Sequence, residues 1–161
     1  MCCGKMNERD EKLKLRQNVA GILVQTGSGK ILICERYNTA GAWQFPQGGV
    51  DEGESLEQAL TRELFEEISL KAGDYTVLDR KGPYRYLYGD GRLVRGHHGK
   101  VQHYFLARLD APAARINVET EHPEFRDIRW ILPADFKIKW LPEMKHEVYR
   151  AVFKDFFGVV I

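Results

Sequence analysis

Runs of β-branched and aliphatic residues alternate with glycine-rich and charged segments along this chain. Two such runs, 18–25 and 30–37, flank Thr26-Gly27-Ser28-Gly29, a pattern typical of a β-hairpin. Further strands are expected at 75–88, 101–109 and 127–132, with a tight turn at Gly89-Asp90-Gly91. A loop at 38–42 leads to a short extended piece at 43–46. Gln47-Gly48-Gly49 is then expected to let the backbone turn tightly and approach a ligand.

Two segments have the periodicity of amphipathic helices. Ser55, followed three residues later by Gln58, matches a capping box, so a helix should begin there. Its apolar stripe consists of Leu56, Ala59, Leu60, Leu64 and Ile68. One helical turn is expected at 133–136, and a C-terminal helix within 142–157. Strands on both sides of a central helix predict an α/β fold, and the hairpins favour a mixed sheet.

Length and composition indicate one domain of ordinary globular character. The chain has 161 residues, of which the polar segment 1–15 should fray, leaving a single domain over 16–161. Lys and Arg number 24 against 23 Asp and Glu, so the net charge of +1 indicates no particular partner. No apolar run approaches the length of a membrane span, and no signal core precedes the first strand.

The cysteines do not form a disulfide framework. Cys34 lies in an apolar run and should be a buried small hydrophobe, while Cys2 and Cys3 fall in the polar start of the chain. A reducing, cytoplasmic location is therefore expected.

The predicted central helix carries an acidic face. Glu63, Glu66 and Glu67 are three and four residues apart, which places their side chains on one side of a helix. Like charges so placed repel and cost stability unless a cation lies among them. Water and counter-ions would screen them; alternatively, a divalent metal such as Mg²⁺ would bind their oxygens.

This acidic stretch resembles the Nudix box. The pattern is Gly48, five residues, Glu54, seven residues, Arg62-Glu63-Leu64-Phe65-Glu66-Glu67, one residue, then Ser69-Leu70. The family usually has glycine where Ser69 stands. A left-handed helix end suits glycine, and serine adopts it at a cost of about 1 kcal/mol.

The resemblance extends over residues 16–157 and is weakest over 76–100. It is closest to one branch of the family, the bacterial RNA pyrophosphohydrolases and diadenosine polyphosphate hydrolases. The residues that carry it are Arg16, Asn18, Trp43-Gln44-Phe45-Pro46-Gln47-Gly48-Gly49, Tyr104-Phe105-Leu106, Pro123-Glu124-Phe125, Lys145 and Val148-Tyr149.

The resemblance implies a fold and a metal-dependent chemistry. The fold would be a Nudix-type α/β/α sandwich with a mixed central sheet. The reaction would be phosphoanhydride hydrolysis assisted by Mg²⁺ or Mn²⁺, which activate water and neutralise phosphate oxygens. Glu63, Glu66 and Glu67 are the implied catalytic residues and metal ligands, with Glu63 as the candidate general base, although family members differ on that assignment.

Other residues are implied to support this centre. The Gly48 carbonyl would be a further ligand, and Glu124 matches another ligand position, with Glu119 and Glu121 as nearby competitors. Glu54 and Arg62 would brace the glycine loop against the helix, because a guanidinium pairs bidentately with a carboxylate.

Substrate contacts are implied for residues outside the box, and each could instead be an ordinary exposed cation or a packing residue. They are Arg16, Arg36, Gln47, Lys100, His103, Met144 and Lys145. Only one face of the strand that holds Gln102, His103 and Tyr104 can line a cleft. Trp43 and Phe45 are interpreted as core residues.

The segment Arg80–Lys100 is basic and aromatic. It contains Asp90 as its only acid, together with Arg80, Lys81, Tyr84, Arg85, Tyr86, Tyr88, Arg92, Arg95 and Lys100. Cations interleaved with aromatic rings are typical of single-stranded RNA binding, by phosphate attraction and base stacking. The alternative is a solvated hairpin.

These patterns lead to a first hypothesis and two alternatives. The first is removal of pyrophosphate from the 5′-triphosphate end of RNA. The second is asymmetric hydrolysis of diadenosine polyphosphates or of other nucleoside polyphosphates. The third is a non-catalytic nucleotide-binding or RNA-binding module, which the intact set of carboxylates disfavours. The partner would be RNA or a nucleoside polyphosphate, with no membrane, and the oligomeric state does not follow from the residues.

Overall fold

The computed structural model describes residues 13–161, so Cys2, Cys3 and most of the segment expected to fray lie outside the described residues. The strands are β1 Leu15–Val24, β2 Ile31–Arg36, β3 Trp43–Gln44, β4 Gln47–Gly49, β5 Tyr75–Leu87, β6 Gly99–Leu109 and β7 Phe125–Ile131. The helices are α1 Leu56–Ile68 and α2 His146–Phe157, with 3₁₀ turns at Ala113–Arg115, Pro133–Asp135, Ile138–Trp140 and Glu143–Lys145.

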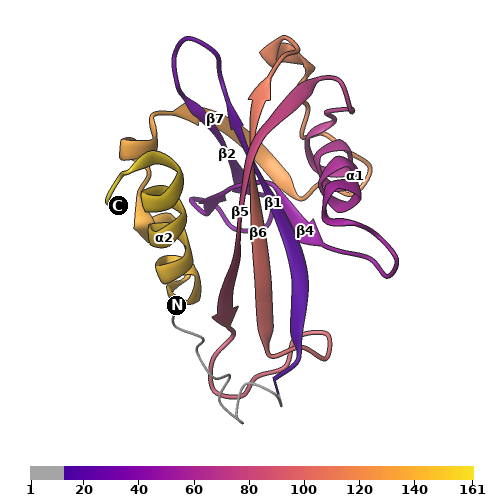
Figure 1. The fold of residues 1–161 in the computed structure, drawn as a ribbon, viewed down its shortest axis with the longest axis vertical. Coiled ribbons are helices and arrows are strands. Elements are labelled where there is room, and N and C mark those ends of the chain that lie inside the picture. Colours follow the sequence, from indigo (N-terminus) through magenta and orange to yellow (C-terminus); the bar gives the residue numbers. More distant parts are fainter. Residues whose placement is uncertain (1–12) are drawn as a thin grey trace, which may run out of the picture.

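The strands form one mixed sheet between two helices. Its order is β3-β2-β1-β6-β5, with β4 also paired to β1 and β7 to β2. β1 and β6 run parallel along their length, and the other pairs are antiparallel. Helices α1 and α2 lie on opposite sides of this sheet (Figure 1). The expected α/β/α sandwich with a mixed sheet is confirmed.

The two faces of the sheet bury separate apolar clusters. Val19, Leu23 and Phe105 pack against α1, whereas Ile22 and Tyr104 pack against α2. Alternate residues of β1 and β6 thus point to opposite cores, and each fully buried large apolar side chain contributes roughly 1.5–3 kcal/mol. Within residues 13–161, no helix is long and apolar enough to cross a bilayer.

The expected packing residues lie in the core. Phe45 is fully buried and stacks on Tyr149 with ring centroids 5.3 Å apart. Trp43 and Cys34 are also buried, as expected.

Helix α1 begins where the sequence predicted. The Ser55 side chain accepts a hydrogen bond from the Gln58 N–H at 3.1 Å, and Gln58 Oε1 accepts one from the Ser55 N–H at 2.8 Å. Both halves of the capping box are therefore present.

Two segments differ from their sequence-based prediction. Gln47–Gly49 is not a turn but strand β4, paired with Asn18–Ala20. The turn at Gly89-Asp90-Gly91 is present, with Asp90 at φ 50°, but the connection between β5 and β6 is longer than this turn and spans residues 88–98. β5 also shifts register twice, near Val77 and near Tyr84, so its pairing is irregular.

Candidate active site

The glycines of β4 make room for two charged side chains. A Cβ on Gly48 would lie 2.0 Å from Glu63 Cδ, and a Cβ on Gly49 would lie 2.2 Å from Arg16 Nη2. Neither glycine has a positive φ. Glycine is thus required here for close approach of side chains to the backbone, not for turning.

Glu67 is the most deeply buried carboxylate of the acidic face. It is 6% exposed, and its Oε2 accepts a hydrogen bond from the Gln47 N–H at 3.1 Å. Burial, followed by the charge of Glu63, raises the pKa of Glu67 well above its usual range. Burial also raises the pKa of Glu63. Two facing buried carboxylates are costly unless a proton or a cation lies with them.

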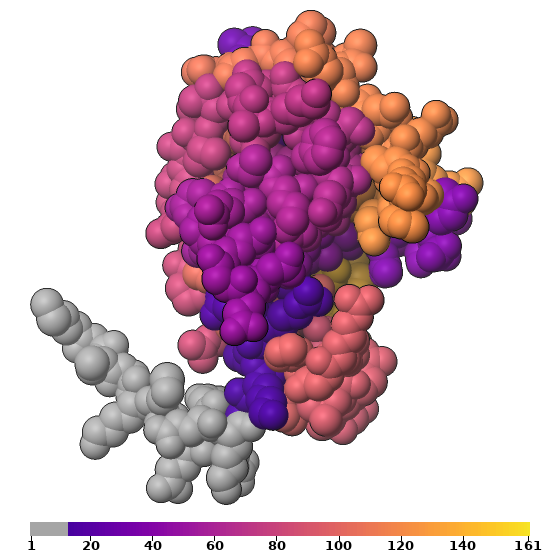
Figure 2. Space-filling view, turned by 90° about the vertical axis from the view of Figure 1, so that its right-hand side faces the viewer, coloured from indigo at the N-terminus to yellow at the C-terminus, as the bar shows by residue number. Residues whose placement is uncertain are grey.

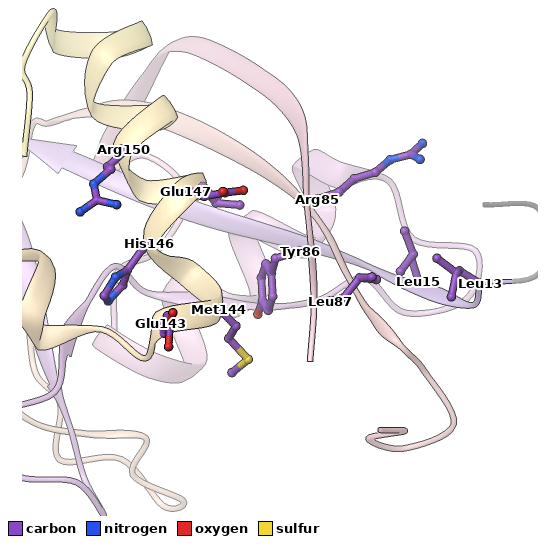
Figure 3. A pocket seen from close by; sticks show the side chains of 11 residues that line it. Leu13, Leu15, Arg85, Tyr86, Leu87, Glu143, Met144, His146, Glu147 and Arg150 are labelled. Carbon is purple, nitrogen blue, oxygen red and sulfur yellow. The ribbon is translucent and has the colours of Figure 1, made fainter. Parts of the chain in front are cut away.

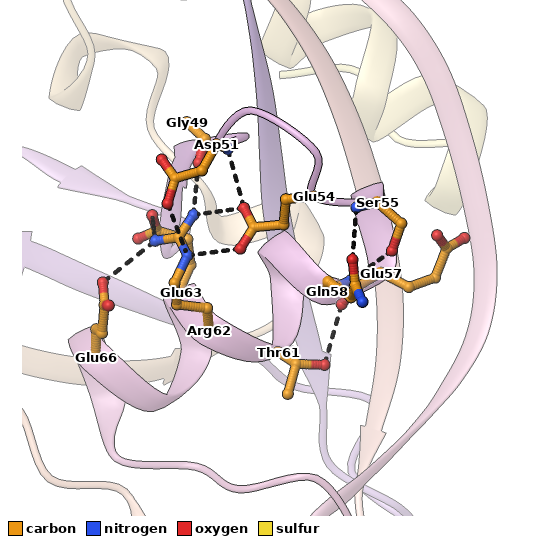
Figure 4. A network of polar contacts seen from close by, with 10 residues as sticks. All are labelled: Gly49, Asp51, Glu54, Ser55, Glu57, Gln58, Thr61, Arg62, Glu63 and Glu66. Atoms are coloured by element: carbon orange, nitrogen blue, oxygen red, sulfur yellow. Dashed lines mark hydrogen bonds and ion pairs between the residues drawn. The ribbon is translucent and has the colours of Figure 1, made fainter.

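Arg62 links the end of β4 and the segment that follows it to helix α1 (Figure 4). Its Nε and Nη2 each contact Glu54 at 2.8 Å, its Nη2 donates to the Gly49 carbonyl at 2.8 Å, and its Nη1 contacts Glu63 Oε1 at 2.7 Å. Asp51 at 3.4 Å and Glu66 at 3.3 Å complete the set. The Arg62 hydrogen bond is the main reason that the pKa of Glu54 is lowered to about 2.

The carboxylate oxygens of Glu63, Glu66 and Glu67 are of the type that binds a hard divalent cation. Among residues 13–161, no three His, Cys, Asp or Glu side chains stand in a metal-binding arrangement. Figure 4 shows the Arg62 guanidinium in contact with Glu63 and Glu66. Arg62 therefore competes with a cation for the oxygens of Glu63 and Glu66. The set is all oxygen, and the buried negative charge is only partly neutralised, so it fits Mg²⁺-type chemistry.

A second acidic segment faces the helix across a cavity of about 630 Å³. The loop that leads into β7 contributes Glu119, Glu121 and Glu124 to the lining, and α1 contributes Glu63, Glu66 and Glu67. The charge of Glu124 adds to the raised pKa of Glu67, which indicates that Glu124 lies close to it. The Glu124 carbonyl accepts a hydrogen bond from the Tyr37 N–H at 2.9 Å, which fixes this end of the loop.

Ser69 fastens the other end of the same loop. It ends α1 in the left-handed region, with φ 65° and ψ 16°. Its Oγ donates to the Asn117 carbonyl at 2.8 Å, and the Asn117 N–H donates to the Ile68 carbonyl at 3.0 Å. One hydrogen bond contributes about 1 kcal/mol, which offsets the cost of serine in this conformation. The departure from glycine therefore anchors the glutamate loop to α1.

Cations gather on the α2 side of the sheet, next to the carboxylates. Lys145 is 9% exposed, and its Nζ donates to Gln44 Oε1 at 3.2 Å. Burial, then the charges of Lys100 and Arg36, lower its pKa to about 7. Burial and the charges of Arg16 and Arg36 likewise lower the pKa of Lys100, while Glu67 opposes that shift. These four cations thus lie together and close to the acidic helix.

Gln47 joins the acidic and the basic halves of the site. Its N–H contacts Glu67, and its Oε1 accepts hydrogen bonds from Asn18 at 2.9 Å and from Gln102 at 3.2 Å. Asn18 Oδ1 and Gln102 Oε1 are buried with no partner among the described residues. These orphaned acceptors leave polar capacity for a ligand or a water beside Lys145. Gln44 was missed as a site residue, because its only sequence signal is its place in the Trp43–Gly49 stretch.

Two predicted substrate contacts lie apart from this group. His103 is on the α1 face of β6, where its Nε2 is 3.0 Å from Gln17 Oε1, whereas Gln102 and Lys100 occupy the other face. Met144 is half-buried and lines a separate cavity of about 540 Å³ with Tyr86 and Leu87, between the start of α2 and β5 (Figure 3).

Known proteins are similar to this chain over nearly its whole length. The model of the NUDIX domain matches residues 15–156. The chain belongs to the Nudix family. Relatives named RNA pyrophosphohydrolase include one from Tolumonas auensis, 39% identical over 91% of this chain and 86% of the relative. Another, from Aeromonas hydrophila, is 40% identical over 88% of this chain and 83% of the relative.

A solved Ap4A hydrolase from C. elegans has the same fold, with a TM-score of 0.63, 20% identity, and coverage of 89% of this chain and 99% of the other. Nudix hydrolases generally need divalent cations, which agrees with the oxygen donors of α1 and of the facing loop.

Proposed function

We propose that this Nudix chain, as a single domain over residues 16–161, removes pyrophosphate from the 5′-triphosphate end of RNA. The observation that carries the proposal is that two clusters of opposite charge lie near each other, with Gln47 between them. The carboxylates of α1 lie on one side, and Arg36, Lys100 and Lys145 lie on the other. Relatives at 39% and 40% identity bear the name of this activity. RNA as substrate also makes the cytoplasm the expected location.

The cofactor in this proposal is Mg²⁺ or Mn²⁺, since every donor is an oxygen. When bound, it would lower the pKa of water and neutralise phosphate oxygens. Glu63, Glu66, Glu67, Glu124 and the Gly48 carbonyl would hold it. One water is consumed, the bond between the α- and β-phosphates breaks, pyrophosphate leaves, and a 5′-monophosphate remains on the RNA. Glu63 is the candidate acceptor of the water's proton.

The cations of the α2 side would bind the polyphosphate. Arg36, Lys100 and Lys145 would attract the charged oxygens and stabilise the charge that develops as pyrophosphate departs. Glu54 and Arg62 stay outside the reaction and hold the loop of β4 in place.

The test compares substrates under one set of conditions. Purified protein with Mg²⁺ should convert 5′-triphosphorylated RNA to 5′-monophosphorylated RNA and release pyrophosphate, with a higher kcat/KM than for diadenosine tetraphosphate. If the dinucleotide is consumed while the RNA stays triphosphorylated, the proposal is wrong and the alternative hydrolase replaces it. If neither is consumed but nucleotide binds, the chain is a binding module.

Binding of the polyphosphate should weaken as pH rises, because Lys145 loses its proton with a pKa of about 7. An anionic substrate favours the charged amine, so we expect KM to increase between pH 6 and pH 9. Lys145→Gln should have a raised KM that depends less on pH in this range, because only Lys100, whose pKa is also lowered, remains to lose a proton. The exposed Lys139→Gln serves as the control. An unchanged pH profile in Lys145→Gln would show that this amine does not contact the phosphates.

A further inference from the structure

The basic segment of residues 80–100 divides into two parts in the folded chain. Arg80 pairs with Glu57 at 3.0 Å, and Lys81 pairs with Asp79 at 3.4 Å, so these cations are neutralised on the chain itself. Arg85, Arg92 and Arg95 are exposed and have no ion pair among residues 13–161. Arg85 is in β5, whereas Arg92 and Arg95 belong to the loop of residues 88–98, hereafter the β5–β6 loop.

The β5–β6 loop is fixed beside the start of β1. The His98 N–H donates to the Lys14 carbonyl at 2.7 Å, and the Lys14 N–H donates to His98 Nδ1 at 3.0 Å. The Tyr88 N–H also donates to the His98 carbonyl at 2.9 Å. In Figure 2 the loop (salmon) projects from the lower part of the molecule beside β1 (indigo), with a hollow between it and the segments above. The loop is therefore an anchored projection, not a free strand end.

The cations of the β5–β6 loop extend the group formed by Arg16, Arg36, Lys100 and Lys145. Arg16 and Lys100 are partners across β1 and β6, and Lys100 is the partner of Tyr86 across β6 and β5. Arg95 lies close enough to Lys100 and to Tyr88 to affect the pKa of both groups. The Arg92 guanidinium lies 5.9 Å from the centre of the Tyr88 ring. A strip of positive charge thus runs from the neighbourhood of Glu67, through Lys100 and Arg95, to Arg92 and Tyr88.

Such a strip suits a linear polyanion that extends beyond the reacting phosphates. Unpaired arginines beside an aromatic ring bind single-stranded nucleic acid through phosphate contacts and base stacking. The triphosphate itself would already occupy Arg36, Lys100 and Lys145. We propose that the β5–β6 loop, through Arg92, Arg95 and Tyr88, binds the third and later nucleotides of single-stranded RNA. This inference rests on the proposed function and assigns the RNA its direction across the surface.

The consequence is a preference for longer RNA chains. A dinucleoside polyphosphate places its charge between two nucleosides and offers no downstream phosphodiesters to this loop. RNA of several nucleotides should gain affinity from the loop, whereas a triphosphorylated dinucleotide should not.

The test uses the double variant Arg92→Gln/Arg95→Gln. With triphosphorylated RNA of eight nucleotides, we expect kcat/KM to fall about tenfold or more, through KM, because two phosphate contacts are lost. The slope of log binding constant against log salt should also become shallower by roughly 1.4, at about 0.7 for each lost contact to a single strand. With a triphosphorylated dinucleotide, kcat/KM should stay within about twofold of the parent, because no downstream phosphates reach the loop.

The matched control is Arg108→Gln/Arg115→Gln, which removes the same charge from the opposite end of β6 and from the turn after it. It should leave both substrates unaffected. The inference is overturned if Arg92→Gln/Arg95→Gln acts normally on the longer RNA, or if it loses the same factor on both substrates. A parent protein that hydrolyses diadenosine tetraphosphate but neither RNA would instead refute the proposed function.

Discussion

Glu67→Gln should lower kcat by roughly 10³-fold with Mg²⁺ while the protein stays folded. The change removes the charge that would hold the cation at the most buried position of the acidic face. The amide oxygen can still accept the hydrogen bond from the Gln47 N–H. Because Glu63 and Glu67 face each other in a buried site, loss of one carboxylate also relieves repulsion. We therefore expect the free energy of unfolding in EDTA to equal or exceed that of the parent.

Two measurements separate this expectation from a structural role of Glu67. The first is kcat at saturating substrate, and the second is urea unfolding in EDTA followed by circular dichroism. Glu57→Gln on the exposed side of the same helix is the control and should keep full activity. An active Glu67→Gln protein, within about tenfold of the parent, would remove Glu67 from the metal site. Lower stability than the parent in EDTA would show that the carboxylate is structural.

Features encoded within one helix were predictable from the sequence. The Ser55–Gln58 capping box and the apolar stripe depend on residues three and four apart, and both are present. The shared face of Glu63, Glu66 and Glu67 follows from the same spacing. The sandwich architecture followed from the order of strands and helices and from the resemblance to the Nudix box.

Features that depend on contacts between distant segments were not predictable. The glycines of β4 looked like turn residues, but their role is set by Glu63 and Arg16, which approach from other elements. The side of the sheet that His103 takes depends on the pairing of β6 with β1. The anchoring of the glutamate loop depends on Ser69 meeting Asn117, 48 residues away. No local pattern marks these encounters.

Arg62→Met should lower the free energy of unfolding by about 3 kcal/mol at pH 7, because it strips partly buried carboxylates of their cation. The Arg62 side chain is only 26% exposed, and those of Glu54 and Glu63 are 15% and 12% exposed. Without the guanidinium, Glu54, Glu63 and Glu66 repel one another, and the Gly49 carbonyl loses its donor. Arg62→Lys keeps the charge but not the two-pronged contact with Glu54, so it should lose an intermediate amount.

The effect of Arg62→Met should depend on pH in a defined direction. The pKa of Glu54 is lowered to about 2 from an ordinary value of 4.5, so the stability that this pair contributes is complete above pH 4.5 and is lost as pH falls through 2. The difference between parent and variant should therefore shrink between pH 5 and pH 2.

Urea unfolding at a series of pH values measures this difference, with Arg115→Met as the control. The Arg115 side chain is 55% exposed, and its contact with Asp74 is long, at 3.5 Å. Loss of Arg115 should therefore cost less than about 1 kcal/mol. A deficit for Arg62→Met that stays constant from pH 7 to pH 2 would contradict the charge pairing. It would instead assign the role of Arg62 to the packing of its hydrocarbon stem.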